Sequence, residues 1–371
     1  MKILFITPHI PSDKAGGAKF TKLLLEKLSQ NHLIDLLYFR YSNESDYTPP
    51  NSNIRIIKVC PNSKKIKLFN TIQYPFIHPL FSVRFNRNIL NFLKRKFNEN
   101  QYDLFFLDHS QMALYGKFFP NTTKIYMSHD VMAQRYGRSS NAIIKALITS
   151  TEKKLMTQPN TLVFSFSEKD KDIIYKQYNI NSYVTNFYLD NIILKAKPEQ
   201  INKQIVFFGK WNRADNFIGL KWFIENVLSI LPKNIKILII GSELPKTFHT
   251  HIKDIPNIEY LGFVQNPYSI ISNSLAVISP LFSGAGVKVK VIESLACGTP
   301  VIGNEIAFEG ISKKYNNFML YADKPEDYKN LICKLNIPLS KRNLFKEFFL
   351  ENYQKQYISS FIDNLESNVK A

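Results

Sequence analysis

One glycine-containing loop has the residue types of an anion-binding site. In residues 279–310, which read SPLFSGAGVKVKVIESLACGTPVIGNEIAFEG, an apolar strand is followed by the small-residue loop 283–286. The helical pattern that comes next has one apolar face, formed by Val287, Val291 and Leu295. Strand, loop, helix and a further strand make one parallel βαβ step. Its loop directs backbone N–H groups and the positive end of a helix toward a ligand.

Two pairs of polar residues follow short apolar strands in the first half of the chain. Asp108 and His109 come after the run 103–107, and His129 and Asp130 come after the next apolar strand. Ligands of open α/β sheets bind beyond the carboxyl ends of the strands, so both pairs stand where chemistry would occur. A lone histidine at a strand end is more often a structural hydrogen-bonding residue, and both interpretations are open.

A double glycine marks the first turn of the chain. The apolar strand 2–8 leads into a loop that ends in Gly16 and Gly17, and residues 18–31 have helical spacing. A glycine pair lets the backbone come close to a ligand near a helix start, or simply makes a tight turn.

The composition predicts a soluble cytoplasmic protein. With 371 residues and 45% hydrophobic residues, the chain is long enough for two α/β domains. No apolar run approaches the roughly 20 residues that span a bilayer. The start is too short and too strand-like for a signal peptide. Three cysteines far apart in the sequence fit a reducing compartment and neither a disulfide framework nor a zinc site.

The net charge of +18 favours anionic partners, although a compositional bias toward Lys, Asn, Ile and Tyr explains it equally well. In the segment 64–97, basic and aromatic residues alternate, and helical spacing is seen from about 79 to 98. Such a stretch can lie on an anionic membrane surface. Alternatively, it packs its apolar face on a sheet and exposes its basic face to solvent. Nothing in the sequence resembles a nucleic-acid recognition motif, and nucleic acid is not an expected partner.

The alternation of strands and helices restarts in the second half of the chain. Residues 1–190 alternate apolar strands with helices, 191–203 are polar without periodicity, 204–345 repeat the alternation, and 346–371 are helical. Alternating strands and helices predict parallel sheets. We therefore expect two doubly wound, Rossmann-like α/β domains facing across a cleft, with a hinge at 191–203 and a C-terminal helix that crosses back.

The second half resembles the donor-binding domain of retaining GT-B glycosyltransferases, the family described as glycosyl transferases group 1. The resemblance rests on the segments VFFGKWNRADN and NIEYLGFV and, above all, on residues 279–310. The first half is similar to the acceptor domain of this family, more loosely. The resemblance implies transfer of a sugar from a nucleotide diphosphate sugar to an acceptor hydroxyl, with retained anomeric configuration and without a metal or other cofactor.

The resemblance also assigns residues to the donor. Glu293 matches the family glutamate that bonds the nucleotide ribose, and a carboxylate can accept two hydroxyl hydrogen bonds. The basic residues and the glycine loop match phosphate-contacting positions, and 262–264 match the loop that lines the base pocket. The expected donor-binding residues are Gly209, Lys210, Arg213, Gly262, Phe263, Val264, Gly284, Ala285, Gly286, Val287, Lys288, Lys290 and Glu293.

On the acceptor side, the expected catalytic residues position the acceptor and handle its proton; they are Asp108, His109, His129 and Asp130. Gly16 and Gly17 are assigned to an acceptor or phosphate loop. By analogy with the family, the acceptor is a glycan or lipid-linked intermediate of bacterial surface polysaccharide or glycoconjugate synthesis. The enzyme would then work in the cytoplasm, peripherally on the inner face of the cell membrane.

One position departs from the family pattern. Many relatives carry two glutamates eight positions apart, and eight residues before Glu293 this chain has Ala285. The missing carboxylate normally contacts the donor sugar, so the sugar end of the site stays unassigned. Two alternatives remain open: a catalytically silent GT-B subunit that partners another glycosyltransferase, and a sugar-nucleotide epimerase of the same fold.

Overall fold

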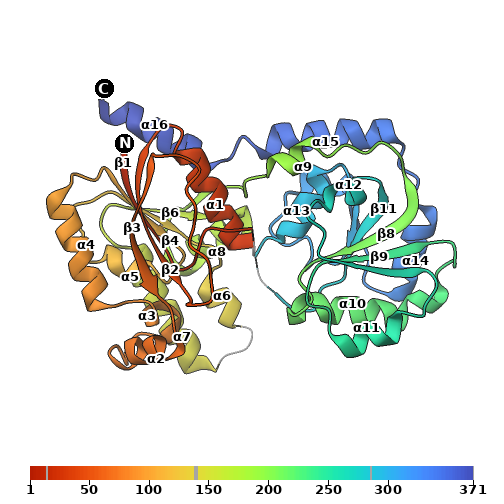
Figure 1. The fold of residues 1–371 in the computed structure, drawn as a ribbon, viewed down its shortest axis with the longest axis horizontal. Coiled ribbons are helices and arrows are strands. Elements are labelled where there is room, and N and C mark those ends of the chain that lie inside the picture. The colour runs from red at the N-terminus through yellow and green to blue at the C-terminus, as the bar shows by residue number, and fades with distance from the viewer. Residues whose placement is uncertain (14–15, 138–140, 285, 371) are drawn as a thin grey trace. The chain divides into compact units, whose positions relative to one another are not determined.

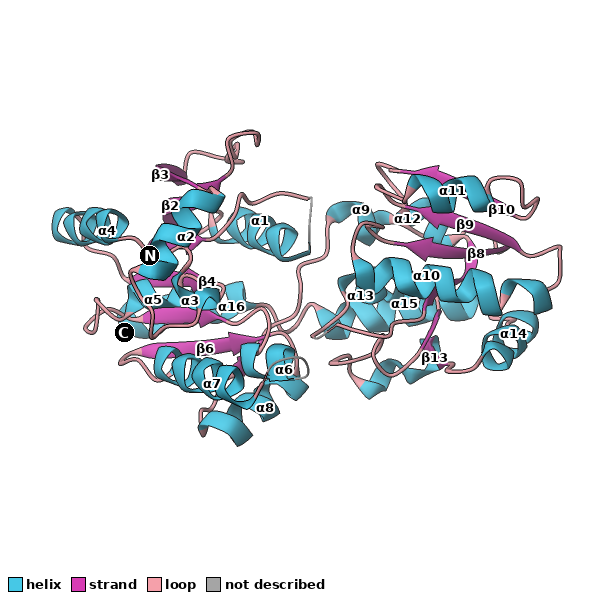
Figure 2. Cartoon of the chain, turned by 90° about the horizontal axis from the view of Figure 1, so that it is seen from below, coloured by secondary structure: helices cyan, strands magenta, loops and turns pink. Residues whose placement is uncertain are grey.

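The computed structural model describes residues 1–13, 16–137, 141–284 and 286–370. It divides into two compact units, of which unit 1 comprises Met1–Tyr188 and Gln356–Ala371 and unit 2 comprises Leu189–Lys355. Each unit contains one parallel sheet flanked by helices (Figures 1 and 2). The predicted fold class, two doubly wound α/β domains with a terminal helix that returns to the first, is confirmed.

The sheet of unit 1 has the strand order β3-β2-β1-β4-β5-β6-β7, and every pairing is parallel. The strands are β1 (Lys2–Thr7), β2 (Leu33–Arg40), β3 (Ile54–Pro61), β4 (Leu104–Asp108), β5 (Lys124–Met127), β6 (Thr161–Ser165) and β7 (Tyr183–Val184). The helices are α1 (Gly16–Leu28), α2 (Lys64–Ile72), α3 (Pro79–Ser82), α4 (Arg87–Glu99), α5 (Ala113–Gly116), α6 (Met132–Gly137), α7 (Ala142–Met156), α8 (Glu168–Tyr178) and α16 (Ile358–Lys370).

Unit 2 repeats this plan with the strand order β10-β9-β8-β11-β12-β13, again all parallel. The strands are β8 (Asn202–Phe208), β9 (Lys236–Ile240), β10 (Ile258–Gly262), β11 (Ser274–Ser279), β12 (Val301–Gly303) and β13 (Met319–Tyr321). The helices are α9 (Asn191–Lys195), α10 (Ala214–Asn226), η1 (Leu228–Ile230), α11 (Lys246–Ile252), α12 (Tyr268–Ser272), α13 (Val289–Ala296), η2 (Lys313–Phe318), α14 (Pro325–Lys334) and α15 (Leu339–Tyr353).

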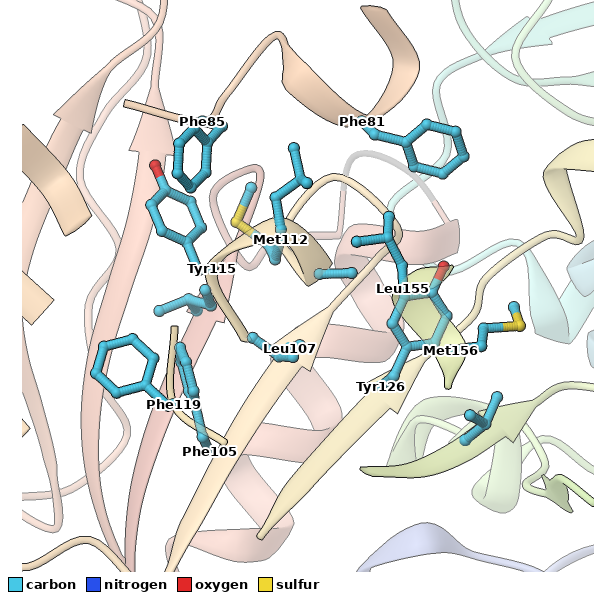
Figure 3. Packing of buried hydrophobic residues seen from close by; sticks show 14 of the residues in the cluster. Phe81, Phe85, Phe105, Leu107, Met112, Tyr115, Phe119, Tyr126, Leu155 and Met156 are labelled. Atoms are coloured by element: carbon cyan, nitrogen blue, oxygen red, sulfur yellow. The ribbon is translucent and has the colours of Figure 1, made fainter. Parts of the chain in front are cut away.

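The central strands are continuous apolar runs because helices cover both faces of each sheet. In β1 and β4 nearly every side chain is buried, and Phe5 of β1 stacks on Phe106 of β4 with ring centroids 4.4 Å apart. Figure 3 shows part of the core on one face of this sheet, where aromatic residues of β4, β5 and the helices around them pack together. This packing holds the ends of the strands, and hence the residues that follow them, in fixed positions.

The helices of the basic segment differ from the continuous pattern that the sequence predicts. Residues 79–98 form two helices, α3 and α4, because Asn86 is extended and caps α4 by accepting a hydrogen bond from the backbone N–H of Asn88. Ile89, Leu90 and Leu93 of α4 are buried in the core of unit 1. For α4, the structure therefore favours the alternative of a helix that packs on the sheet.

The polar segment 191–203 lies within unit 2. It contains α9, whose Ile193 is fully buried, and the side chain of Lys346 on α15 donates hydrogen bonds to the carbonyls of Ile193 and Leu194. The chain passes between the units at 188–189 and at 355–356. Polar composition is a weak guide here, because Ile193 packs into the core of unit 2 and the carbonyls around it accept hydrogen bonds from a distant lysine.

The helical tail is made of two helices, and each belongs to a different unit. α15 packs against α13 of unit 2, whereas α16 lies beside α1 of unit 1 (Figure 1). In α16, Phe361 contacts the rings of Phe164 and Tyr183, and Asp363 pairs with His32 at 2.9 Å. None of the described helices is long and apolar enough to cross a membrane.

Candidate functional site

In unit 2, the loops that follow β8, β9 and β10 are joined by backbone hydrogen bonds. The N–H of Gly209 donates to Ile240, that of Trp211 donates to Ser242, and that of Gly241 donates to Gly262. Gly241 has φ +130°, and a Cβ at this position would lie 1.7 Å from the carbonyl oxygen of Gly209. Only glycine allows these loops to approach so closely. The carboxyl edge of the sheet is thus one continuous surface of loops.

Asn216, at the start of α10, connects two parts of this edge. Its side-chain amide donates to the carbonyl of Lys210 at 3.0 Å, and its amide oxygen accepts from Lys290 Nζ at 3.0 Å. Beside it, Asp215 accepts a hydrogen bond from Ser283 Oγ at 2.7 Å. Asn216 and Asp215 were not among the predicted site residues. Their signal was present in the KWNRADN segment, as two polar side chains at a helix start.

The glycine loop and its lysines lie where the sequence predicts them, but the helix begins later. α13 starts at Val289 with Lys288 as its extended N-cap residue, and Val287 lies before the helix and packs partly on the core. Gly284 and Gly286 have φ values of +112° and +69°. Lys288 Nζ donates to the carbonyl of Gly286 at 2.6 Å and lies 3.5 Å from Glu309. Ala285 lies outside the described residues.

Lys290 lies in a cationic environment. Burial, together with the charges of Lys288 and Arg213, lowers the pKa of Lys290 to about 7, and Asp215 opposes this shift. The neutral form is favoured because an ammonium group here loses hydration and lies near like charges. An anionic ligand at this position would reverse that balance.

Lys210 and Arg213 of the first loop are more exposed. Lys210 pairs with Glu243 at 2.9 Å, and Arg213 lies 3.6 Å from Asp215. Such exposed pairs contribute about 0–1 kcal/mol each, so a phosphate could displace the carboxylates at little cost. β10 ends at Gly262, which has φ +65°. The side chain of the next residue, Phe263, is 78% exposed, and Val264 follows it. A flat, exposed aromatic ring at this edge suits stacking on a planar base.

Glu293 lies on α13 and is only 6% exposed, so it is not a solvated residue on an open helix face. It forms a hydrogen bond with the hydroxyl of Tyr268, whose pKa is raised by burial and by this carboxylate. The bond holds the carboxylate in one orientation. A carboxylate can accept more than one hydrogen bond, as binding of a diol requires.

In unit 1, Asp108 is the centre of a polar cluster at the carboxyl end of the sheet. Its fully buried carboxylate accepts from His129 Nε2 at 2.7 Å and from Thr21 Oγ1 at 2.7 Å. Burial opposes ionisation of Asp108, but His129, His9 and Thr21 together lower its pKa below the ordinary value. His129 therefore presents the N–H of Nε2 to Asp108, and a histidine oriented by a carboxylate suits proton handling.

His109 lies in the same cluster and is held by a strained backbone. It has φ +65°, uncommon for a residue other than glycine, and its ring stacks on His129 with centroids 3.3 Å apart. A Cβ on Gly17 would lie 3.2 Å from both rings, so the double glycine lets α1 start directly against the histidines. Gly16 is the first residue of this helix. Asp130 points elsewhere and binds Arg135 at 2.6 Å.

His9 completes this cluster and was not predicted. It follows β1 in the sequence and lies edge-on to His109, with ring centroids 4.5 Å apart. Burial lowers the pKa of His9 to about 4 against the opposing charge of Asp108, and His129 and Arg84 contribute to the lowering. Burial also holds the pKa of His109 well below its usual value. The sequence signal for His9 was a histidine just after a strand, the same feature that singled out His109 and His129.

Comparison with known proteins identifies the family of the second unit. Residues 202–336 match the family model for glycosyl transferases group 1. The resemblance to these glycosyltransferases is confirmed. No curated protein sequence gives a significant match.

The whole chain shares the GT-B fold of several solved glycosyltransferase structures. Sucrose-phosphate synthase from Thermosynechococcus elongatus superposes with a TM-score of 0.72 at 13% identity, over 99% of this chain and 98% of that one. Anabaena HepE in complex with UDP gives 0.68 at 14% identity, over 100% of both chains. WaaG, a glycosyltransferase involved in lipopolysaccharide biosynthesis, gives 0.62 at 13% identity, over 98% of both.

Lys290 of this group 1 domain predicts that binding of a nucleoside diphosphate takes up a proton. At pH 8 a lysine with a pKa of about 7 is mostly neutral, and a diphosphate beside it would raise that pKa. The affinity for UDP should therefore fall as the pH rises from 7 to 9. Calorimetry at pH 8 in two buffers of different ionisation enthalpy measures the proton. Lys290→Met should abolish uptake, and Lys221→Met, an exposed change on α10, should not. An affinity independent of pH in the wild type would contradict this role.

Glu293 of the same domain predicts a large effect on nucleotide affinity. Hydrogen bonds to a charged group contribute about 1.5–3 kcal/mol, so Glu293→Ala should weaken UDP binding about 10- to 100-fold in calorimetry. Tyr268→Phe removes the internal partner but keeps the carboxylate, and it should retain most of the affinity. Melting temperatures of both variants monitor the fold. Equal UDP affinity in Glu293→Ala and the wild type would refute the assignment.

Proposed function

We propose that this protein is a glycosyltransferase that transfers a sugar from a UDP-sugar to an acceptor hydroxyl with retained anomeric configuration. The observation that carries the proposal is the arrangement in unit 2. Asn216 bonds both the Lys210 loop and Lys290, and the buried Glu293 lies one turn further along α13. The lysines would bind the diphosphate, and Glu293 the ribose.

The choice of uridine rests on structural neighbours. Structures of Anabaena HepE contain UDP, and one contains UDP-glucose. Another similar protein, Staphylococcus aureus TarM, is described in complex with UDP. Phe263, which is exposed at the edge of the same sheet, would stack on the base, and Gly262 and Val264 would complete its pocket.

No metal is needed in this proposal, because the chain itself supplies positive charge at the diphosphate. The group of cations comprises Lys210, Arg213, Lys288 and Lys290. In transfer of the sugar, negative charge accumulates on the departing diphosphate, and cations fixed beside it stabilise that charge in the transition state. The lowered pKa of Lys290 in the free protein is compatible with this role, since an anionic ligand would raise that pKa and restore the charged form.

In unit 1, the cluster around Asp108 would act on the acceptor. Asp108 orients His129, and His129 or His109 would hydrogen-bond the acceptor hydroxyl and receive its proton. Asp130, which binds Arg135, would act only through the position of the 128–131 loop. By analogy with WaaG, the acceptor would be a glycan or lipid-linked intermediate of bacterial surface polysaccharide or glycoconjugate synthesis.

A nucleotide panel tests the proposed donor. UDP should raise the melting temperature more than GDP, TDP, ADP or CMP, and the rise should be the same with and without EDTA. Stabilisation by none of these nucleotides would favour a catalytically silent subunit. With a UDP-sugar alone, formation of an epimerised nucleotide sugar would favour an epimerase, whereas the transferase should need an acceptor. Anomeric inversion in the product would refute the retaining mechanism.

The exposed face of α2 supports a further part of the proposal, attachment to the inner face of the cell membrane. Four large apolar side chains on and after α2 are strongly exposed, namely Leu68 at 63%, Phe69 at 58%, Ile72 at 67% and Phe76 at 87%. Lys64 and Lys65 at its start are exposed as well. An exposed apolar stripe with adjacent cations fits an anionic bilayer, which accommodates both. The surface therefore comprises α2 and the turn after it, while α4 packs on the core.

Liposome co-sedimentation tests this membrane surface. The wild type should bind vesicles that contain anionic lipid at low salt and should be released as salt increases. The double variant Phe69→Ser, Phe76→Ser should lose most of the binding. Leu344→Ser, which removes a side chain of similar exposure (65%) from α15, should retain it. Equal binding by the wild type and the double variant would show that α2 is not the contact.

A further inference from the structure

Arg84 is a half-buried cation for which the described residues supply no acidic partner. Its Nε is buried and has no hydrogen-bond partner among the described residues. Its Nη1 donates a hydrogen bond to the amide oxygen of Gln111. Burial lowers the pKa of Arg84, and the group that opposes this shift is Tyr41, not an acidic side chain. Because a charge largely removed from water is normally paired, the unsatisfied Nε of this guanidinium leaves a donor that an anionic ligand could use.

Two histidine nitrogens on the same side of unit 1 are unsatisfied as well. His9 Nε2 and His109 Nε2 are also buried without a hydrogen-bond partner among the described residues. The charge of Arg84 also contributes, as the smallest of the causes, to the lowered pKa of both histidines. Gln111, which binds Arg84, is only two residues after His109, in the loop that follows β4. Three nitrogen atoms in this region thus have no hydrogen-bond partner in the described part of the chain.

Two ligands could use these nitrogens. His9, Asp108 and His109 offer ligand atoms that lie within 4.8 Å of one another, as a divalent metal ion would require. However, Asp108 already accepts hydrogen bonds from His129 and Thr21, and the charge of Arg84 would repel a cation. An anion would satisfy all three nitrogens at once, and Arg84 would supply the charge that neutral histidines lack.

We propose that Arg84, His9 and His109 bind an anionic group of the acceptor, a phosphate or a carboxylate. This inference rests on the proposed function, because the cluster adjoins Asp108 and His129, which would act on the acceptor hydroxyl. The guanidinium would form a charge-assisted hydrogen bond through Nε, and each histidine would donate from Nε2. Acceptors that carry phosphate or carboxylate near the reacting hydroxyl would then be preferred over neutral sugars.

Phosphate binding to the UDP-saturated protein tests the inference, since UDP first occupies the diphosphate site of unit 2. Inorganic phosphate, glycerol 3-phosphate and acetate are titrated by calorimetry. The wild type should bind phosphate or acetate, and the stronger ligand identifies the preferred anion. Arg84→Met should weaken this binding at least tenfold while UDP affinity stays unchanged. Arg87→Met, an exposed change three residues later, should affect neither. His9→Phe, which keeps an aromatic ring, should weaken anion binding as well.

Other outcomes separate the inference from the proposed function. If the wild type binds UDP but no anion thereafter, or if Arg84→Met binds phosphate normally, the anion site is refuted and the transferase stands. If Zn²⁺ binds to the wild type and to Arg84→Met but not to His9→Phe, the cluster is a metal site instead. If UDP itself does not bind, the proposed function fails first. Comparing the affinity for glycerol 3-phosphate with the affinity for vesicles of phosphatidic acid distinguishes a soluble phosphate ligand from a lipid headgroup.

Discussion

The parallel pairing of the strands is the constraint on which the rest of this structure depends. Because every strand of a sheet runs in the same direction, every loop that leaves a carboxyl end emerges at the same edge. In unit 2 this brings the loops after β8, β9, β10 and β11 together, although they are spread over about 80 residues of sequence. Gly241, which permits its loop to contact Gly209, shows how closely the edge is packed. The same constraint collects His9, Asp108 and His129 from three strands of unit 1.

Both candidate sites hold ionisable groups away from water, and they do so in opposite ways. In unit 1 the carboxylate of Asp108 is fully buried but stabilised by two hydrogen bonds, so it stays ionised. In unit 2 the amine of Lys290 has the amide of Asn216 as its partner and like charges nearby, so its charge is disfavoured. The first arrangement fixes a histidine. The second leaves a cation that forms fully only with an anionic ligand.

The amphipathic segment of unit 1 illustrates how the same residue types can serve different ends. Basic and aromatic residues recur through both α2 and α4. The apolar side chains of α4 fill the core next to β4, while those of α2 stay exposed. Arg84 lies between α2 and α4 in the sequence, and its Nε is buried. The described residues supply no acidic partner for its charge. One stretch of sequence therefore supplies part of the core, an exposed apolar surface and an inward-facing cation.

The sequence by itself determined the fold class and most of the residues at the carboxyl edges of the two sheets. Hydrophobic periodicity and glycine position are local, so the βα units, the 283–286 loop and the position of Glu293 could all be predicted. The helix start at Val289, the break between α3 and α4, and the transfer of 191–203 to unit 2 could not, because caps and backbone contacts with distant residues decide them. Only the tertiary structure showed Asn216 beside Lys290, His9 beside His109, and Arg84 without an acidic partner. Each depends on which side chains from remote segments share one small volume, and a linear pattern does not contain that information.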